Sequence, residues 1–126
     1  MKLRIRDNSI RLRLTQTEVT QAGEEGVVRG TVSFGGGGDF EYVLRGSQDS
    51  DARADFSGNA LTVSVPQGAL RQWAESEQVS LSGSQPVGGG GELAILVEKD
   101  FACLAPREGE DESDMFPHPE AGKADC

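Results

Sequence analysis

Two stretches of the chain decide its fold: residues 8–22 (NSIRLRLTQTEVTQA) and residues 59–73 (NALTVSVPQGALRQW). Each stretch begins with alternating apolar and polar residues, the pattern of a half-buried strand, and then turns into a polar segment at helical spacing. When the two are aligned, their apolar positions coincide: Ile10 with Leu61, Leu12 with Val63, and Leu14 with Val65. The sequence therefore predicts the same strand-and-helix unit twice.

The similarity continues beyond these stretches. After an insertion of two residues, Gly30 aligns with Gly83, and the glycine tract 35–38 aligns with the tract 88–91. Apolar residues follow both tracts at matching positions: Phe40, Tyr42 and Leu44 after the first, and Leu93, Ile95 and Val97 after the second. We therefore predict an internal repeat in a single domain: 1–126 overall, with repeat 1 at 2–46, repeat 2 at 53–99 and a C-terminal tail at 101–126.

Each repeat is expected to form a hairpin, a short helix and a second hairpin. Thr15-x-x-Glu18 is a capping box that starts the first helix, and Gly23 is expected to end it. Pro66 suits the start of the second helix. Besides the two hairpin strands at the N-terminus, strands are expected near 27–34, 40–46, 52–56, 79–84 and 92–99.

These elements predict a mainly β (α+β) fold. A single hairpin is marginally stable in water, so two halves that face one another across a pseudo-two-fold axis would share one core. We expect an antiparallel barrel or sandwich built from two ββαββ repeats, with two short helices and an extended acidic tail.

Composition excludes several classes of protein. The chain has 126 residues, a net charge of −9, and no apolar run approaching the roughly 18 residues of a membrane span. An acidic chain is a poor ligand for nucleic acid, and two cysteines are too few for a disulfide-built scaffold. We therefore expect a soluble cytoplasmic protein with no membrane partner, and we consider a nucleic-acid partner unfavourable.

The charge is distributed unevenly. The N-terminal hairpin carries a basic row on one face: Arg4, Arg6, Arg11 and Arg13. The tail is acidic, with four carboxylates between Glu108 and Glu112. Like charges opposed on a sheet are destabilising, so the row needs an explanation. Three interpretations are open: the segment Glu108–Asp114 docks on the row, the row is simply solvated, or it binds an external anion or a nucleic-acid backbone. Of these we predict the docking of the tail.

The two ends of the chain carry the most specific motifs. Residues 2–19 (KLRIRDNSIRLRLTQTEV) and 98–119 (EKDFACLAPREGEDESDMFPHP) resemble a family of small bacterial proteins of unknown function, of about this length. The resemblance implies a bacterial, cytoplasmic protein. It implies no activity, cofactor or partner.

The tail also collects the residue types that bind metals. Cys103, His118 and Cys126, with an oxygen as fourth ligand, would form an acceptable zinc or iron set, although their spacing matches no standard metal motif. A Cys103–Cys126 disulfide and an inert role for all three residues are the alternatives. We therefore expect no cofactor, and a small zinc- or iron-binding protein is the second hypothesis.

Catalysis has little support in the sequence. The chain has one histidine, and a hydrolytic pair of Cys103 with Asp111 or Asp114 is the weakest hypothesis. The glycine tracts lack the Lys-Ser/Thr ending of a phosphate-binding loop. Leu70 and Trp73 fit a helical core better than a ligand stack. The leading hypothesis is a non-enzymatic binding or interaction module, with Arg4, Arg6, Arg11 and Arg13 as its interaction surface.

Overall fold

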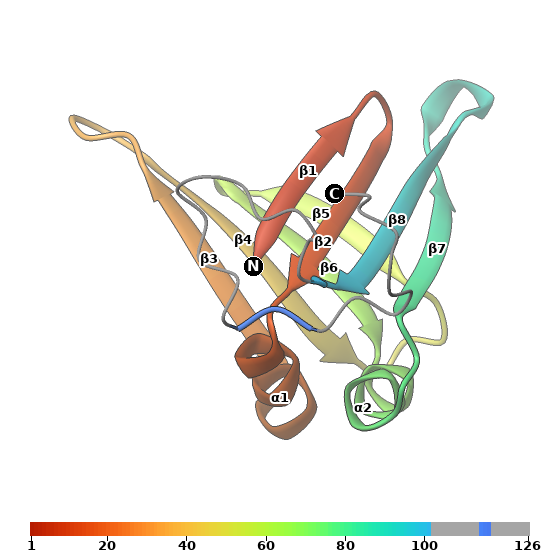
Figure 1. Ribbon diagram of the computed structural model, residues 1–126. Helices are drawn as coiled ribbons and strands as arrows, with labels where there is room; N and C mark the ends of the chain where they lie inside the picture. The colour runs from red at the N-terminus through yellow and green to blue at the C-terminus, as the bar shows by residue number, and fades with distance from the viewer. Residues whose placement is uncertain (102–113, 117–126) are drawn as a thin grey trace, which may run out of the picture.

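The computed structural model of the chain describes residues 1–101 and 114–116. Eight strands and two α-helices follow one another along the described chain (Figure 1). They are β1 (Lys2–Arg6), β2 (Ser9–Leu14), α1 (Gln16–Glu25), β3 (Val27–Ser33), β4 (Asp39–Ser47), β5 (Arg53–Ser57), β6 (Ala60–Pro66), α2 (Gln67–Glu75), β7 (Ser80–Pro86) and β8 (Glu92–Lys99). A short 3₁₀ turn, Gly88–Gly90, precedes β8. The prediction of a mainly β protein with two short helices is confirmed.

The strands form two four-stranded sheets. Sheet A has the order β1-β2-β8-β7, and sheet B has the order β3-β4-β6-β5. In both sheets the two central strands run parallel and each outer strand pairs antiparallel with its neighbour. Each sheet therefore combines one hairpin from residues 2–46 with one from residues 53–99.

We expected an antiparallel barrel or sandwich: the closed barrel is wrong, and the pairing is antiparallel only between each outer strand and its neighbour. The sheets are mixed, and they do not close into a barrel. The physical reason is that the central strands of each sheet come from different halves of the chain. No tight turn joins them, so nothing forces them to run antiparallel.

Local sequence explains where the helices begin and end. Thr15 caps α1 in a complete capping box with Glu18, as predicted, and the carboxylate of Glu18 also pairs with the amino terminus of Met1. The prediction that Gly23 ends this helix is wrong, because α1 continues to Gly26, which has the left-handed φ of 74° typical of a C-terminal cap. Gly23 is instead a point of close helix packing: a Cβ built there would lie 2.8 Å from the Cβ of Ala74 on α2.

The core lies between the inner faces of the sheets and the two helices. Its members are buried aliphatic residues of both sheets together with the apolar side of each helix: Leu12, Leu14, Val19, Ala22, Val28, Leu44, Val63, Val65, Leu70, Trp73, Ile95 and Val97. Leu70 and Trp73 are core residues, as predicted, and the Trp73 indole N–H donates to the Val79 carbonyl at 2.9 Å.

The sheets converge at the helices and separate toward the hairpin turns, so that the molecule has the form of a V with α1 and α2 at its base (Figure 1). At the open end the inner faces are only partly covered. Large apolar side chains there are exposed, including Ile5, Val32, Phe34 and Phe56.

Candidate functional site

The basic face is the outer face of the β1–β2 hairpin and contains Lys2, Arg4, Arg6, Arg11 and Arg13. Leu3 and Ile5 alternate with its β1 members and turn to the inner side, where Leu3 packs against the core. In the antiparallel register Lys2 lies opposite Arg13, and Arg4 lies opposite Arg11. The fold therefore brings the four predicted arginines together with Lys2, and like charges stand directly across from one another.

Two acidic residues offset part of this charge. The carboxylate of Glu98 on β8 accepts a hydrogen bond from Arg13 Nε at 2.6 Å, and Arg11 Nε lies 3.6 Å from the same oxygen. At the end of the face, Lys2 Nζ lies 3.2 Å from Oδ2 of Asp100. In the part of the chain that the structure describes, Arg4 and Arg6 form no ion pair. Among the described residues, three of the five cations of the basic face thus pair with two carboxylates.

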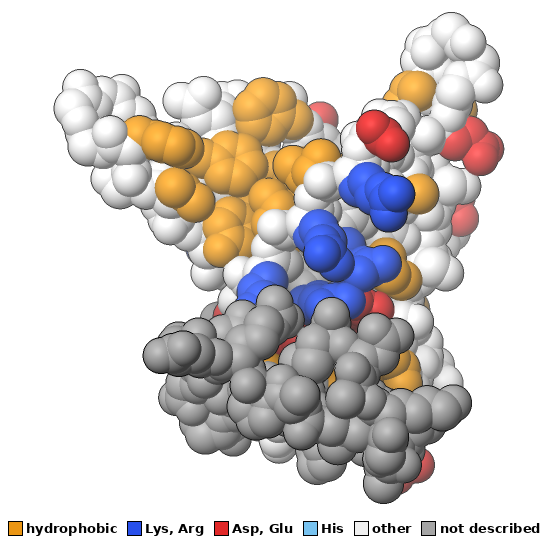
Figure 2. All heavy atoms as spheres, turned by 45° about the horizontal axis from the view of Figure 1, so that its top comes forward, with side chains coloured by type: hydrophobic (Ala, Val, Ile, Leu, Met, Phe, Trp, Pro, Cys, Tyr) orange, Lys and Arg blue, Asp and Glu red, His pale blue; other side chains and the backbone are white. Residues whose placement is uncertain are grey.

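Arg4 and Arg6 border a hollow on this face. A pocket of about 280 Å³ is lined by Arg4, Arg6, Ser9 and Arg11. The basic side chains form a continuous surface patch (Figure 2). Three guanidinium groups and one hydroxyl are donors that suit carboxylate or phosphate oxygens, so the hollow has the chemistry of an anion site.

Glu98 could not be assigned to this face from the sequence. It reaches Arg13 because β2 pairs in parallel with β8, which brings Arg13 beside Glu98 across the two halves of the chain. An expectation of antiparallel pairing within each half does not produce this neighbour. The signal that would have found it is a single acid at the end of an otherwise apolar strand.

The described part of the tail contacts the start of α1. The Gln16 N–H donates to the Asp114 carbonyl at 2.9 Å, and the Thr17 N–H and hydroxyl donate to Asp114 Oδ1 at 3.2 and 3.1 Å. A carboxylate is favourable at a helix N-terminus. Met115 is buried, and the Phe116 ring lies 5.6 Å from that of Phe101. Met115 and Phe116 therefore anchor this part of the tail by apolar contacts, whereas Glu108–Ser113 lie outside the described residues and their docking on the basic face stays a prediction.

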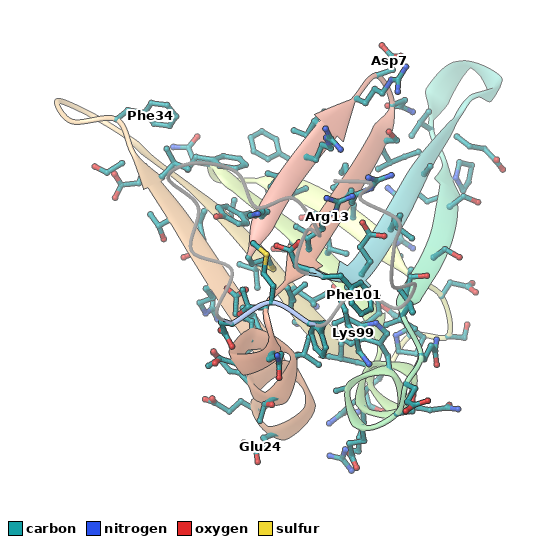
Figure 3. All side chains as sticks on the ribbon, viewed as in Figure 1. Asp7, Arg13, Glu24, Phe34, Lys99 and Phe101 are labelled. Atoms are coloured by element: carbon teal, nitrogen blue, oxygen red, sulfur yellow. The ribbon has the colours of Figure 1, made fainter. Side chains whose placement is uncertain are left out.

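A buried lysine beside this contact was not foreseen. Lys99 Nζ donates to the Ser76 carbonyl at 2.7 Å, and it lies 5.8 Å from the Trp73 ring centre and 5.5 Å from that of Phe116. Figure 3 shows Lys99 and Phe101 together above α2. Desolvation lowers the pKa of Lys99, and the nearby Glu77 acts in the opposite direction. Its contacts close the end of α2, so we interpret Lys99 as a structural residue.

The residues of the metal hypothesis, Cys103, His118 and Cys126, lie outside the described residues, as does Asp111. Within residues 1–101 and 114–116, no three His, Cys, Asp or Glu side chains are placed to hold a metal ion. A zinc or iron site in the tail and a hydrolytic Cys103 therefore stay predictions.

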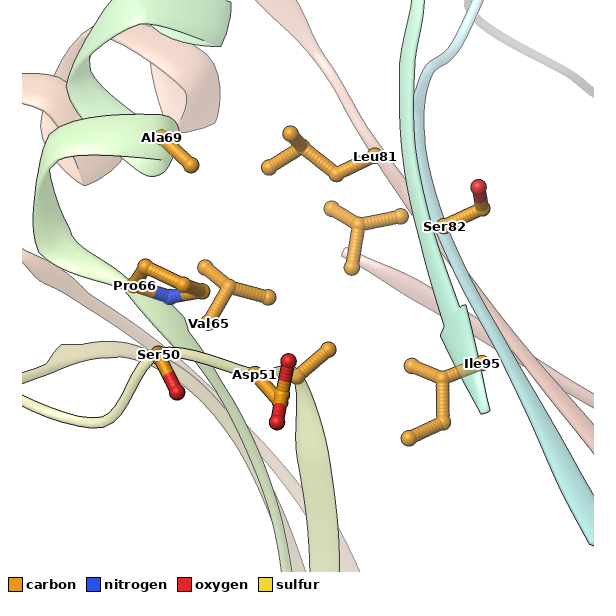
Figure 4. Close-up of a pocket in the computed structure, with 10 residues that line it drawn as sticks. Ser50, Asp51, Val65, Pro66, Ala69, Leu81, Ser82 and Ile95 are labelled. Atoms are coloured by element: carbon orange, nitrogen blue, oxygen red, sulfur yellow. The ribbon is translucent and has the colours of Figure 1, made fainter. Parts of the chain in front are cut away.

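A second pocket, of about 200 Å³, lies between the two sheets, where β6 and the start of α2 face β7 and β8 (Figure 4). Its walls include Val65, Leu81, Ile95 and Val97, and Ser50 and Asp51 supply polar groups from the connecting segment. One carboxylate against aliphatic walls offers little to orient a ligand. Since Val65, Ile95 and Val97 also belong to the core, this pocket is a packing gap and a weaker candidate than the basic face.

Taken together, these features define a two-sheet β protein with a basic hairpin surface. Residues 1–120 match the model of a family of unknown function, DUF7009, and the chain belongs to this family. A comparison with curated proteins gave no match, and neither did a comparison with solved structures. No helix of the described residues is long and apolar enough to span a membrane.

Proposed function

We propose that this protein is a non-enzymatic, cytoplasmic binding module that uses the basic face to bind an anionic partner and needs no cofactor. The observation that carries the proposal is the direct opposition of Arg4 and Arg11 next to Arg6, which forms no ion pair with any described residue. Opposed like charges destabilise a sheet, and a bound anion removes that cost. Glu98 offsets Arg13 and Arg11, whereas among the described residues no acid forms an ion pair with Arg4 or Arg6.

The second half of the chain supports the same proposal. We infer that residues 2–46 and 53–99 are repeats related by a pseudo-two-fold axis. The registers agree with this: Ile10 pairs with Ile95 in sheet A, and the equivalent Leu61 pairs with Tyr42 in sheet B. Gly23 and Ala74, which are equivalent in the alignment, meet each other between the helices, as residues beside such an axis do.

The repeats differ where the basic face lies. The counterparts of its arginines are Asp55, Ser57, Thr62 and Ser64, which build the same hairpin in sheet B. Since that hairpin folds without a basic row, folding does not require the arginines. A surface found on only one of two similar hairpins is best explained by binding.

The test is affinity for a defined polyanion, measured by fluorescence anisotropy with labelled polyglutamate at low salt. A double variant, Arg4→Ser with Arg6→Ser, should lower the affinity about tenfold, and added salt should weaken wild-type binding steeply. The matched control is Arg29→Ser with Arg53→Ser, which removes two arginines from sheet B and should change affinity less than about twofold. Equal losses in both variants would contradict the proposal, because binding would then follow net charge alone.

A further inference from the structure

The two seams of the V, where edge strands of sheets A and B approach, differ in how they are closed. At the β5–β7 seam the Gln85 side chain joins the sheets: its amide accepts from the Ala54 N–H at 2.8 Å and donates to the Ala54 carbonyl at 2.9 Å. At the β1–β3 seam the residue equivalent to Gln85 is Val32, whose side chain has no amide group and forms no hydrogen bond. Within the described chain, no hydrogen bond links β1 to β3.

Among the described strands β1 therefore has a neighbour on one side only, and just before it the Tyr42 hydroxyl on β4 donates to the Met1 carbonyl at 2.9 Å. β1 pairs only with β2 among the described strands, so alternate backbone N–H and C=O groups of Lys2–Arg6 point away from the sheet. An extended edge of this kind is a template for an added strand. The corresponding edge of β5 is occupied by the Gln85 amide.

The inner side of this seam is apolar and rich in aromatic rings. Ile5 on β1 is 64% exposed, Val32 on β3 is 41% exposed and Phe34, just beyond β3, is 72% exposed, values far above those of core residues. Phe40 on β4 lies opposite Val32 in the register, and its ring stacks on that of Tyr42 with the ring centres 6.2 Å apart. Figure 2 shows apolar side chains gathered between the β3–β4 hairpin and the basic side chains, and Figure 3 shows the Phe34 ring projecting from that hairpin toward β1.

We propose that the β1–β3 seam binds an extended acidic peptide segment of a partner protein, which pairs with the edge of β1 and alternates apolar with acidic residues. Side chains of an added strand point alternately to the two faces of the sheet. Those on the outer face meet Arg4 and Arg6, and those on the inner face meet Ile5, Phe34 and Phe40. This proposal rests on the proposed function and names the class of partner.

Charge argues against two other occupants. A second copy that added its own β1 would place Lys2, Arg4 and Arg6 beside the same residues of the first copy, and like charges across a ladder repel. The chain's own acidic segment, residues 108–113 (EGEDES), has the right charge but no apolar residue between its acids. An external segment with alternating residues fits both faces of the seam.

The experiment compares two labelled peptides of equal composition: eight residues that alternate valine and glutamate, and the same residues in two blocks. The alternating peptide should bind about tenfold more tightly, because only it places carboxylates and apolar side chains on opposite faces. A second pair of peptides carries backbone N-methyl groups either on the odd or on the even residues. One pattern should abolish binding and the other should not, because only one edge of the added strand pairs with β1.

Protein variants separate this inference from the proposed function. Phe34→Ser with Phe40→Ser should weaken the alternating peptide about tenfold and leave polyglutamate binding unchanged. Val87→Ser is the matched control: Val87 is the repeat counterpart of Phe34, it is also exposed, and its replacement should have no effect. Arg4→Ser with Arg6→Ser should weaken both ligands. Urea denaturation confirms that each variant is folded.

Equal binding of the two peptides, or no effect of the phenylalanine replacements, would overturn the seam proposal while leaving the proposed function intact. Two further outcomes would also overturn it. One is dimerisation of the free protein that is lost on replacing Phe34. The other concerns the free protein, with the carboxylates between Glu108 and Glu112 replaced by amides. If this replacement moves the amide resonances of β1 and β3, the seam holds the chain's own tail. If the wild-type protein does not bind polyglutamate at all, the proposed function itself is wrong.

Discussion

The strand faces assigned above can be tested by truncating one core residue in each sheet. Leu12 is 1% exposed on β2 and Val63 is 0% exposed on β6. Leu12 has Leu3 and Val97 as ladder neighbours, and Val63 has Ala54 and Leu44. Both sites are enclosed by neighbouring strands, so their surroundings have little room to collapse into a vacated volume.

The expected cost follows from the carbons removed. Leu12→Ala deletes three carbons and Val63→Ala deletes two, which at about 0.8 kcal/mol each gives transfer terms of roughly 2.4 and 1.6 kcal/mol. The cavity left behind adds to both, so we expect losses of about 2–4 kcal/mol, with the larger loss at Leu12. The measurement is the free energy of unfolding in urea, with an unchanged m-value.

Ile5→Ala is the control, since Ile5 is an aliphatic residue on the same sheet face but lies at the open end and is 64% exposed. Its loss should stay below about 1 kcal/mol. Losses below about 1 kcal/mol at both Leu12 and Val63 would refute the assignment, because they would mean that the inner and outer faces are reversed.

Three further perturbations probe other parts of the molecule. Glu98→Gln should raise affinity for polyglutamate about threefold at low salt in the anisotropy assay, because it releases two arginines from their partner, and an unchanged affinity would count against the basic face. Gly23→Ala should lower the melting temperature despite the better helix propensity of alanine, because the added methyl group would meet Ala74. The control is Gly68→Ala on α2, where nothing lies within 4 Å of the new methyl group, and it should not lower the melting temperature. A change of the same sign in both variants would contradict the contact between the helices. Burial lowers the pKa of Lys99 below 10.5, so the unfolded chain holds this proton more tightly than the folded chain does. The free energy of unfolding should therefore rise with pH from the pKa of the folded group up to about 10.5. Lys99→Met should abolish this increase.

The sequence predicted most elements because their signals are local. Alternation located the strands, and the capping box at Thr15 and Glu18 located the start of α1. The end of α1 was misplaced because Gly23 has two uses that sequence does not distinguish. It can end a helix by adopting a positive φ, or it can admit a neighbouring helix, and here it does the second.

The pairing of the sheets could not be predicted, because it depends on contacts between distant segments. Alternation at Ile10 and Leu12 states that one face is buried but does not say which strand lies alongside. The parallel partner, β8, comes from the other half of the chain. The same limit applies to the site: its arginines were evident from their spacing, whereas Glu98 joined them only through that pairing.

The central claim is that the basic face is the binding surface, and amide chemical-shift mapping tests it most directly. Polyglutamate is titrated into ¹⁵N-labelled protein at low salt. Our account predicts that the shifts concentrate in residues 2–13 and around Glu98, and that they disappear as salt is raised. Shifts of equal size around Arg29, Arg53 and Arg71 would contradict it, because the polyanion would then be attracted to any exposed arginine.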